Sequence, residues 1–288
     1  MFGSVNVSAN SLPDLSSADA MPEKVEGNVA RIAEYSSDAG RPIEELWFNT
    51  EGQLYRKETH QPGSITLITR YRYTPAGELI EWYQTGVDNQ RLWSYQHEYD
   101  STGRLHRVIA HGHDGAAEYI EEYTYADENQ HEMVRYDALG IPQWVRKVRR
   151  SGDLLEWELL QPNGGVFSQG AQVYENGLLR SEEVRDGTQA IIERIEYDYD
   201  ESGRILHQRT YDAAQLVQRR SYAYMNSFLE FSRTIEPQQS GRMIQHEIVN
   251  KDQAGNWTNK VHTVMFEQDG EVEVVSSETR RRRIEYRE

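Results

Sequence analysis

The stretch Tyr99-Asp-Ser-Thr-Gly-Arg-Leu105 decides the fold, because the same phrase returns along most of the chain. An aromatic-rich segment precedes each copy, an acidic or polar turn with a glycine forms its centre, and an aliphatic-basic segment follows. Related copies are Tyr71-Arg-Tyr-Thr-Pro-Ala-Gly77-Glu-Leu79, Arg135-Tyr-Asp-Ala-Leu-Gly140 and Tyr197-Asp-Tyr-Asp-Glu-Ser-Gly203-Arg-Ile205. Strand, turn and strand at fixed offsets indicate a repeated β-hairpin.

The glycines of these turns set the strand count. Their spacing is mostly 12 to 13 residues or double that, which predicts roughly twenty short strands in one domain, residues 29–288. Residues 1–28 are rich in Ser, Ala, Asp and Pro, and we expect a flexible leader there. Glycine adopts the positive φ of tight hairpins without strain. The expected turn pivots are Gly77, Gly103, Gly140, Gly203 and Gly255.

The segments between turns alternate in polarity. Apolar and charged residues take turns along residues 191–200, which indicates an antiparallel strand with one buried face. In residues 79–83 both parities are apolar, which indicates a strand covered on both faces. The predicted fold is therefore all-β: a long, twisted, antiparallel sheet of repeated hairpins, either short and open with two broad faces or curled on itself to hide its edges.

Composition narrows the classes of function. The 288 residues include 18 tyrosines, 6 tryptophans and no cysteine, and the formal net charge is −16. The missing cysteines exclude a disulfide scaffold and Cys-ligated zinc. The acidic excess disfavours general nucleic-acid binding and favours a basic partner. No apolar run approaches the length of a membrane span, and the N-terminal residues do not resemble a secretion signal, so we expect a cytoplasmic protein.

The Tyr-Asp-x-x-Gly-Arg-Leu phrase resembles the YD repeat of the Rhs family. Residues 99–105 match it closely, residues 199–205 match with Ile for Leu, and residues 136–140 match in the first half. Residues 251–260 and 281–286 are similar to the closing unit of small free-standing bacterial YD-repeat proteins. The resemblance implies a long twisted β-sheet that winds into a shell or curved sheet. Large members enclose a toxin, but this chain is too short to close such a shell and has no aspartic self-cleavage signature.

Motifs of known chemistry are scarce in this sequence. His111 and His113 could face one cation from a single strand, but spacing places no third ligand beside them. There is no phosphate-binding loop, dinucleotide-binding glycine cluster or nucleophile elbow. Paired carboxylates occur at Glu44-Glu45, Glu121-Glu122 and Glu182-Glu183, as chance allows with 47 acids. We expect no enzyme activity, no cofactor and no metal.

A binding face is the remaining candidate site. Aromatic and acidic side chains of neighbouring strands could form it, since Tyr and Trp dominate interface hot spots, although cross-strand packing also explains aromatics. The expected members are Trp82, Tyr83, Tyr95, Glu118, Glu121, Glu122, Tyr123 and Tyr125. The basic run Arg280 to Arg283 is expected to pair with acids of preceding strands, such as Glu271 and Glu273.

Three functions stay open at this point. The first is a protein-binding module, most specifically an immunity-type antagonist that captures a basic toxin domain and blocks it, which suits an acidic chain. The second is a carbohydrate-binding protein, suggested by the aromatic content and by the family. The third is a glycoside hydrolase with a carboxylate pair.

Overall fold

The computed structural model describes residues 25–37, 40–60, 66–86, 88–225, 228–238 and 241–288. Most of the expected leader, residues 1–24, lies outside these ranges. Within them the regular structure is β-strand throughout, as predicted, and the first strand begins at Val29, the predicted start of the repeat. No helix in the described ranges has the length and apolarity needed to cross a membrane.

The described residues form twenty strands, in agreement with the count from the turn spacing. In chain order they are β1 Val29–Ser36, β2 Glu44–Phe48, β3 Leu54–Thr59, β4 Leu67–Tyr73, β5 Leu79–Thr85, β6 Arg91–Tyr99, β7 Leu105–His111, β8 Ala117–Tyr125, β9 Gln130–Asp137, β10 Pro142–Ser151, β11 Leu154–Leu160, β12 Val166–Glu175, β13 Leu178–Asp186, β14 Ile191–Tyr199, β15 Ile205–Asp212, β16 Gln215–Met225, β17 Phe228–Gln238, β18 Gly241–Lys251, β19 Trp257–Gln268 and β20 Glu271–Tyr286.

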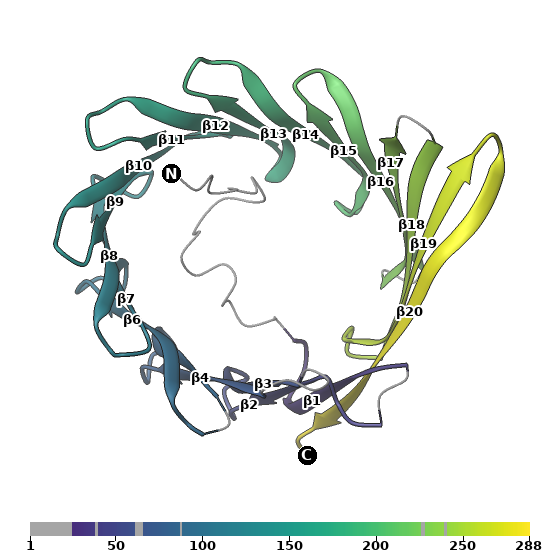
Figure 1. Ribbon diagram of the computed structural model, residues 1–288, viewed down its shortest axis with the longest axis horizontal. Helices are drawn as coiled ribbons and strands as arrows, with labels where there is room; N and C mark the ends of the chain where they lie inside the picture. The colour runs from purple at the N-terminus through teal and green to yellow at the C-terminus, as the bar shows by residue number, and fades with distance from the viewer. Residues whose placement is uncertain (1–24, 38–39, 61–65, 87, 226–227, 239–240) are drawn as a thin grey trace.

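The sheet closes on itself. Each strand pairs antiparallel with the next one along the chain, and β20 pairs both with β19 and, through residues 280–286, with β1. The ladder therefore returns to its first strand, and the strands form a ring (Figure 1). This confirms the curling of the predicted sheet. It corrects the expectation of an open sheet, because the β1–β20 pairing joins the two end strands along residues 280–286 of β20.

The repeated phrase builds the turn between two strands. Asp100 Oδ1 accepts hydrogen bonds from the backbone N–H groups of Thr102 at 2.8 Å and Arg104 at 3.1 Å, and Gly103 adopts a φ of 81°. Aspartate thus fixes the turn backbone, and glycine takes the conformation that a Cβ would strain. All five predicted pivots have positive φ, which confirms them: Gly77, Gly103, Gly140, Gly203 and Gly255.

The tyrosine of the phrase ties each hairpin together. The Tyr125 hydroxyl donates to the carbonyl oxygen of Leu105 at 2.9 Å, on the neighbouring strand, and the Arg104 guanidinium lies 4.6 Å from the centre of the Tyr125 ring. The repeat around Tyr224 has the same hydrogen bond, to Ile205, and the same stacking, by Arg204. The Tyr, Asp, Gly and Arg of the phrase therefore each have a structural role.

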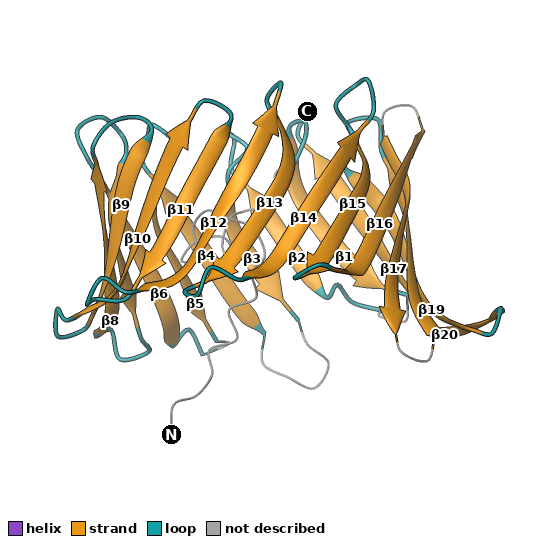
Figure 2. Cartoon of the chain, turned by 90° about the horizontal axis from the view of Figure 1, so that it is seen from above, coloured by secondary structure: helices purple, strands orange, loops and turns teal. Residues whose placement is uncertain are grey.

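Strand handedness decides which side chains face the inside of the ring. With a strand of L-residues running upward and a side chain facing the viewer, the N–H and C=O of that residue point right. Arg150 of β10 donates its N–H to Asn129, beside β9, at 2.8 Å. Figure 2 shows the outer surface of β10 with β9 on its left, so the Arg150 side chain points inward. Alternation then places Lys147 and Arg149 on the outer surface.

The core lies on the inner surface. Following the register from strand to strand, Trp82, Tyr95, Val108, Tyr123 and Met133 all share the inner face. Val108, Tyr123 and Met133 form one buried cluster. A second cluster covers the start of the ring, with members Val29, Ile32, Leu46, Phe48, Leu54 and Tyr71. Burial on a curved inner surface supplies the apolar stabilisation that a flat exposed sheet would lack.

The basic run of β20 stabilises the closure. Arg282 donates to Glu34 of β1 through Nε and Nη2, both at 3.1 Å, and Arg280 Nη1 lies 3.3 Å from the same carboxylate. The expected pairing with Glu271 and Glu273 is therefore wrong. Those two acids lie further back on β20, whereas closure of the ring brings β1 alongside the arginines.

Candidate functional site

Aromatic side chains of β5, β6 and β8 form a packed group on the inner surface. The rings of Trp82 and Tyr95 stack with their centres 4.4 Å apart, and Tyr119 meets Tyr95 edge-on at 6.2 Å. Burial, followed by the hydrogen bond that joins its hydroxyl to Tyr95, raises the pKa of Tyr119. These rings contact one another, so they contribute to cross-strand packing.

A buried ion pair lies beside the aromatic group. Glu121 is fully buried and accepts a hydrogen bond from Arg135 Nε at 3.0 Å and another from the Tyr123 hydroxyl at 3.2 Å. The Arg135 guanidinium lies 4.0 Å from the Tyr119 ring centre and 4.8 Å from that of Trp144. A buried carboxylate needs such compensation, which makes this group a structural network.

The structure divides the predicted binding face between the two surfaces. Trp82, Tyr95, Glu121 and Tyr123 come together on the inner surface. Tyr125 lies at the end of β8 with its hydroxyl on Leu105. Tyr83 and Glu122 point outward, each next in sequence to an inward side chain. The Tyr83 ring lies between Arg70 and Arg91, at 5.9 and 4.3 Å, so both faces of β5 are covered as predicted. Glu118 is exposed near the β7–β8 turn.

The adjacent carboxylates of the sequence do not form catalytic pairs. Glu121 is buried inside the ring, whereas Glu122 lies outside, 3.6 Å from Arg107. Glu182 and Glu183 of β13 are likewise consecutive strand residues and face opposite sides. Such neighbours cannot flank one glycosidic bond, which requires two carboxyl groups on the same side of a site.

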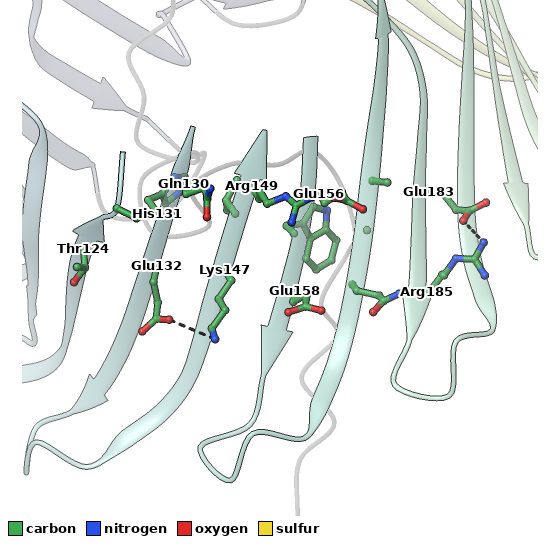
Figure 3. A pocket seen from close by; sticks show the side chains of 16 residues that line it. Thr124, Gln130, His131, Glu132, Lys147, Arg149, Glu156, Glu158, Glu183 and Arg185 are labelled. Carbon is green, nitrogen blue, oxygen red and sulfur yellow. Dashed lines mark ion pairs between the residues drawn. The ribbon is translucent and has the colours of Figure 1, made fainter. Parts of the chain in front are cut away.

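A hollow of about 870 Å³ lies along the wall from β8 to β13 (Figure 3). Its charged side chains form cross-strand pairs: Lys147 with Glu132 at 3.7 Å and Arg149 with Glu156 at 3.8 Å. Another lining residue, Trp157, packs over Gly170, where a Cβ would lie 2.4 Å from the indole nitrogen. The hollow is polar and its cations already have partners, so it does not resemble the apolar pockets that hold small molecules.

The far part of β20 has one strand edge that no described residue pairs with. Residues 271–279 pair with β19 on one side, whereas β1 joins the other side only from Arg280 onward. Figure 1 shows this hairpin projecting from the ring. Val272, Val274 and Val275 are exposed to 56, 59 and 59% there, and Glu271 and Glu273 make the stretch acidic. An exposed edge with apolar side chains is a template for another strand.

The turns hold carboxylates at both rims of the ring. Among the described residues, Asp114, Asp127, Asp137 and Asp186 bind turn backbone N–H groups and have no ion-pair partner. The hydrogen bond from the Thr188 hydroxyl, and then that from its N–H, lower the pKa of Asp186. Bonds from Thr102 and Arg104 lower the pKa of Asp100 in the same way. The lowered pKa keeps Asp100 and Asp186 negative at neutral pH.

Sequence reasoning missed one group of side chains on the outer surface. Within the described ranges, possible metal-ligand atoms of three residues come within 4.8 Å of one another at Glu45, Glu58 and His60. His111 and His113, the pair that the sequence singled out, are not part of such a group. The sequence pointed to Glu45 as a member of the Glu44-Glu45 carboxylate pair. It did not show that Glu58 lies opposite Glu45, because that pairing depends on a register shift in the β2–β3 hairpin.

The known structures that resemble this chain are weak matches. No family model matches the chain. No curated protein matches it either. Similar solved structures include a porin-like protein from Bacteroides uniformis, at 11% identity and a TM-score of 0.40 over 90% of this chain and 98% of that one. Another is the TcdB2-TccC3 structure, at 14% identity and a TM-score of 0.36, which covers 88% of this chain. This chain spans 16% of that protein's length.

A further similar structure is TcdB2-TccC3 without its hypervariable C-terminal region, at 12% identity and a TM-score of 0.32. These likenesses are too weak to bear on function. The described residues form an all-β repeat structure, and the likeness of the chain to YD repeats rests on the turn phrases themselves.

Proposed function

We propose that this protein is a non-enzymatic protein-binding module that captures a basic protein, in the manner of an immunity-type antagonist that binds and blocks a bacterial toxin. The observation that carries the proposal is the free edge of β20. Residues 271–279 leave one row of backbone N–H and C=O groups unpaired and expose valine side chains. A partner strand added at this edge would pair the backbone groups and cover the valines.

The charges support a basic partner. Cross-strand ion pairs neutralise much of the outer wall, as with Arg72 and Arg91, which both contact Glu81, at 2.8 and 3.1 Å. The unpaired negative charge is left at the turns and at the β20 edge. Negative potential at the rims would steer a basic domain toward the ring, and the β20 edge would then hold it.

The test measures association of the purified protein with the basic protein encoded by the neighbouring gene. The double variant Glu271→Lys/Glu273→Lys changes the β20 edge. The matched control, Glu51→Lys/Glu128→Lys, places the same charge change on two exposed turns of the opposite rim. The edge variant should slow association about tenfold and the control much less. Rising salt should slow association of the wild type.

Equal effects of the two variants would show that the β20 edge is not the docking element. Absence of a protein complex, together with binding of a polysaccharide, would favour the carbohydrate alternative. Trp93, which is 45% exposed on the inner surface, is one aromatic side chain that could stack on a sugar ring.

A further inference from the structure

Two carboxylates and one imidazole converge on the outer surface near the start of the ring. Glu45 of β2 lies directly opposite Glu58 of β3 in the hairpin register, and His60 follows the end of β3. Like charges directly opposite each other destabilise a sheet. Their side chains are only 11 and 14% exposed, so solvent screens this repulsion incompletely.

In each carboxylate one oxygen contacts an arginine and the other faces His60. Arg31 contacts Oε1 of Glu45, and Arg56 contacts Oε1 of Glu58. The Oε2 atoms of both acids instead face Nε2 of His60, at 3.2 and 3.6 Å. Oε2 of each acid therefore faces the imidazole of His60 and not an arginine.

The spacing of these atoms fits a tetrahedral metal. Zinc lies about 2.0–2.2 Å from nitrogen and carboxylate ligands, so two ligand atoms in a tetrahedral site are about 3.4 Å apart. The distances from His60 Nε2 to the two Oε2 atoms, 3.2 and 3.6 Å, bracket that value. All three ligand atoms lie within 4.8 Å of one another, so a small inward movement of the carboxylates completes the geometry.

The other nitrogen of His60 has a partner of its own. Nδ1 lies 3.2 Å from the hydroxyl oxygen of Thr66. When Nδ1 donates to Thr66, the lone pair of Nε2 points at two carboxylate oxygens, and only a cation or a proton at Nε2 makes that arrangement favourable. A hydrogen bond to the remote ring nitrogen is the usual support of a metal-bound histidine.

We propose that Glu45, Glu58 and His60 form a binding site for a divalent metal ion, best suited to Zn²⁺, with Thr66 as a positioning residue. The site has three protein ligands and one position open to water or another ligand. The metal joins β2, β3 and the segment after β3 at one point, beside the strand that closes the ring. The site stands independently of the proposed partner.

The experiment uses the full-length protein, freed of metal by a chelator and titrated with ZnCl2 in a calorimeter. One ion should bind per chain, and Co²⁺ should give the intense visible absorption of a four-coordinate ion. His60→Ala and Glu58→Gln should each weaken binding at least tenfold. Thr66→Ala should weaken it about 10–100-fold, as loss of a supporting hydrogen bond does. His113→Ala and Glu122→Gln serve as controls and should bind as the wild type does.

Circular dichroism and thermal melting check that each variant is folded. If His60→Ala does not fold, Glu58→Gln and Thr66→Ala still decide the question. Zinc should also raise the melting temperature of the wild type and leave that of Glu58→Gln unchanged. Absence of stoichiometric binding would overturn the proposal. Binding that survives both ligand substitutions would place the metal elsewhere.

Discussion

Adjacent residues of one strand have different structural roles in this chain, because they face opposite surfaces of the ring. Glu121 and Glu122 show this most clearly, since one compensates Arg135 inside the ring and the other is exposed outside. Charge reversal of Glu121 would bury a cation against Arg135 and test folding instead of binding. Binding experiments therefore belong on acids such as Glu271 and Glu273, which are exposed.

His97 makes stability depend on pH. It is 7% exposed on the inner surface, and burial lowers its pKa from 6.5 to about 4. In the unfolded chain His97 binds a proton below pH 6.5, whereas in the folded chain it binds one only below about pH 4. Stability should therefore fall as the pH drops through this window, by up to about 3 kcal/mol.

The substitution His97→Phe should remove this part of the acid sensitivity. Urea unfolding at several values between pH 7 and pH 4 gives the slope of stability against pH for each variant. His113→Asn is the control, because His113 is exposed in a turn and should leave the slope unchanged. Parallel slopes for the wild type and His97→Phe would contradict the assignment.

At the scale of the elements, the hairpin is the unit that the sequence predicts well. The turn phrase specifies where strands end and which glycines take positive φ, and the alternation shows which side chains share a face, because all three depend on local chemistry. The turn phrase does not predict β-bulges in this way. In the β2–β3 hairpin the partner of Trp47 is Arg56 and that of Phe48 is Leu54, so one extra residue shifts the register.

That single shift explains why the Glu45–Glu58 pairing escaped the sequence. Counting outward from the turn without a bulge would place Lys57 opposite Glu45 and make an ordinary ion pair. With the bulge, Glu45 lies opposite Glu58 and Lys57 lies opposite Leu46. A one-residue change of register thus brings two carboxylates together where an unshifted hairpin would have an ion pair.

The turn glycines allow a direct test of the hairpin unit. Gly103→Val and Gly203→Val should each lower the free energy of unfolding by more than about 1 kcal/mol, because valine is strained at positive φ. Gly40→Val is the matched control, since Gly40 lies in open space without a positive φ. Melting temperatures that fall equally in all three variants would show that the turn conformation is not the cause.

For the whole molecule, closure of the ring is the property that local sequence patterns did not determine. Alternation and turn spacing are the same in an open and a closed sheet, whereas closure depends on the sum of twist and stagger over all strands. The closing contacts join residues far apart in the chain, such as Arg31 and Glu285, which are 254 positions apart. Glu34 is the residue through which this closure can be tested.

Glu34→Leu should lower the free energy of unfolding by about 3 kcal/mol or more, because it takes the carboxylate from Arg282, which is itself buried at the β1–β20 junction. Glu122→Leu removes an exposed acid from the middle of the wall and should cost less than about 1 kcal/mol. Equilibrium unfolding in urea, followed by tryptophan fluorescence, compares the two. Similar losses would mean that the junction is no more critical than any other part of the wall.

The β1–β20 pairing also sets a delay during synthesis between the making of β1 and the making of its partner strand. A ribosome adds about 5–20 residues per second, so the 254 residues between Arg31 and Glu285 take roughly 13 to 50 seconds to synthesise. During that interval β1 is a nascent strand whose partner does not yet exist, and its free side can pair with a strand of another chain. Such a delay favours aggregation at high expression and low chaperone supply, and slower synthesis lengthens it. Synthesis of β20 gives β1 its partner and ends the risk of pairing with another chain.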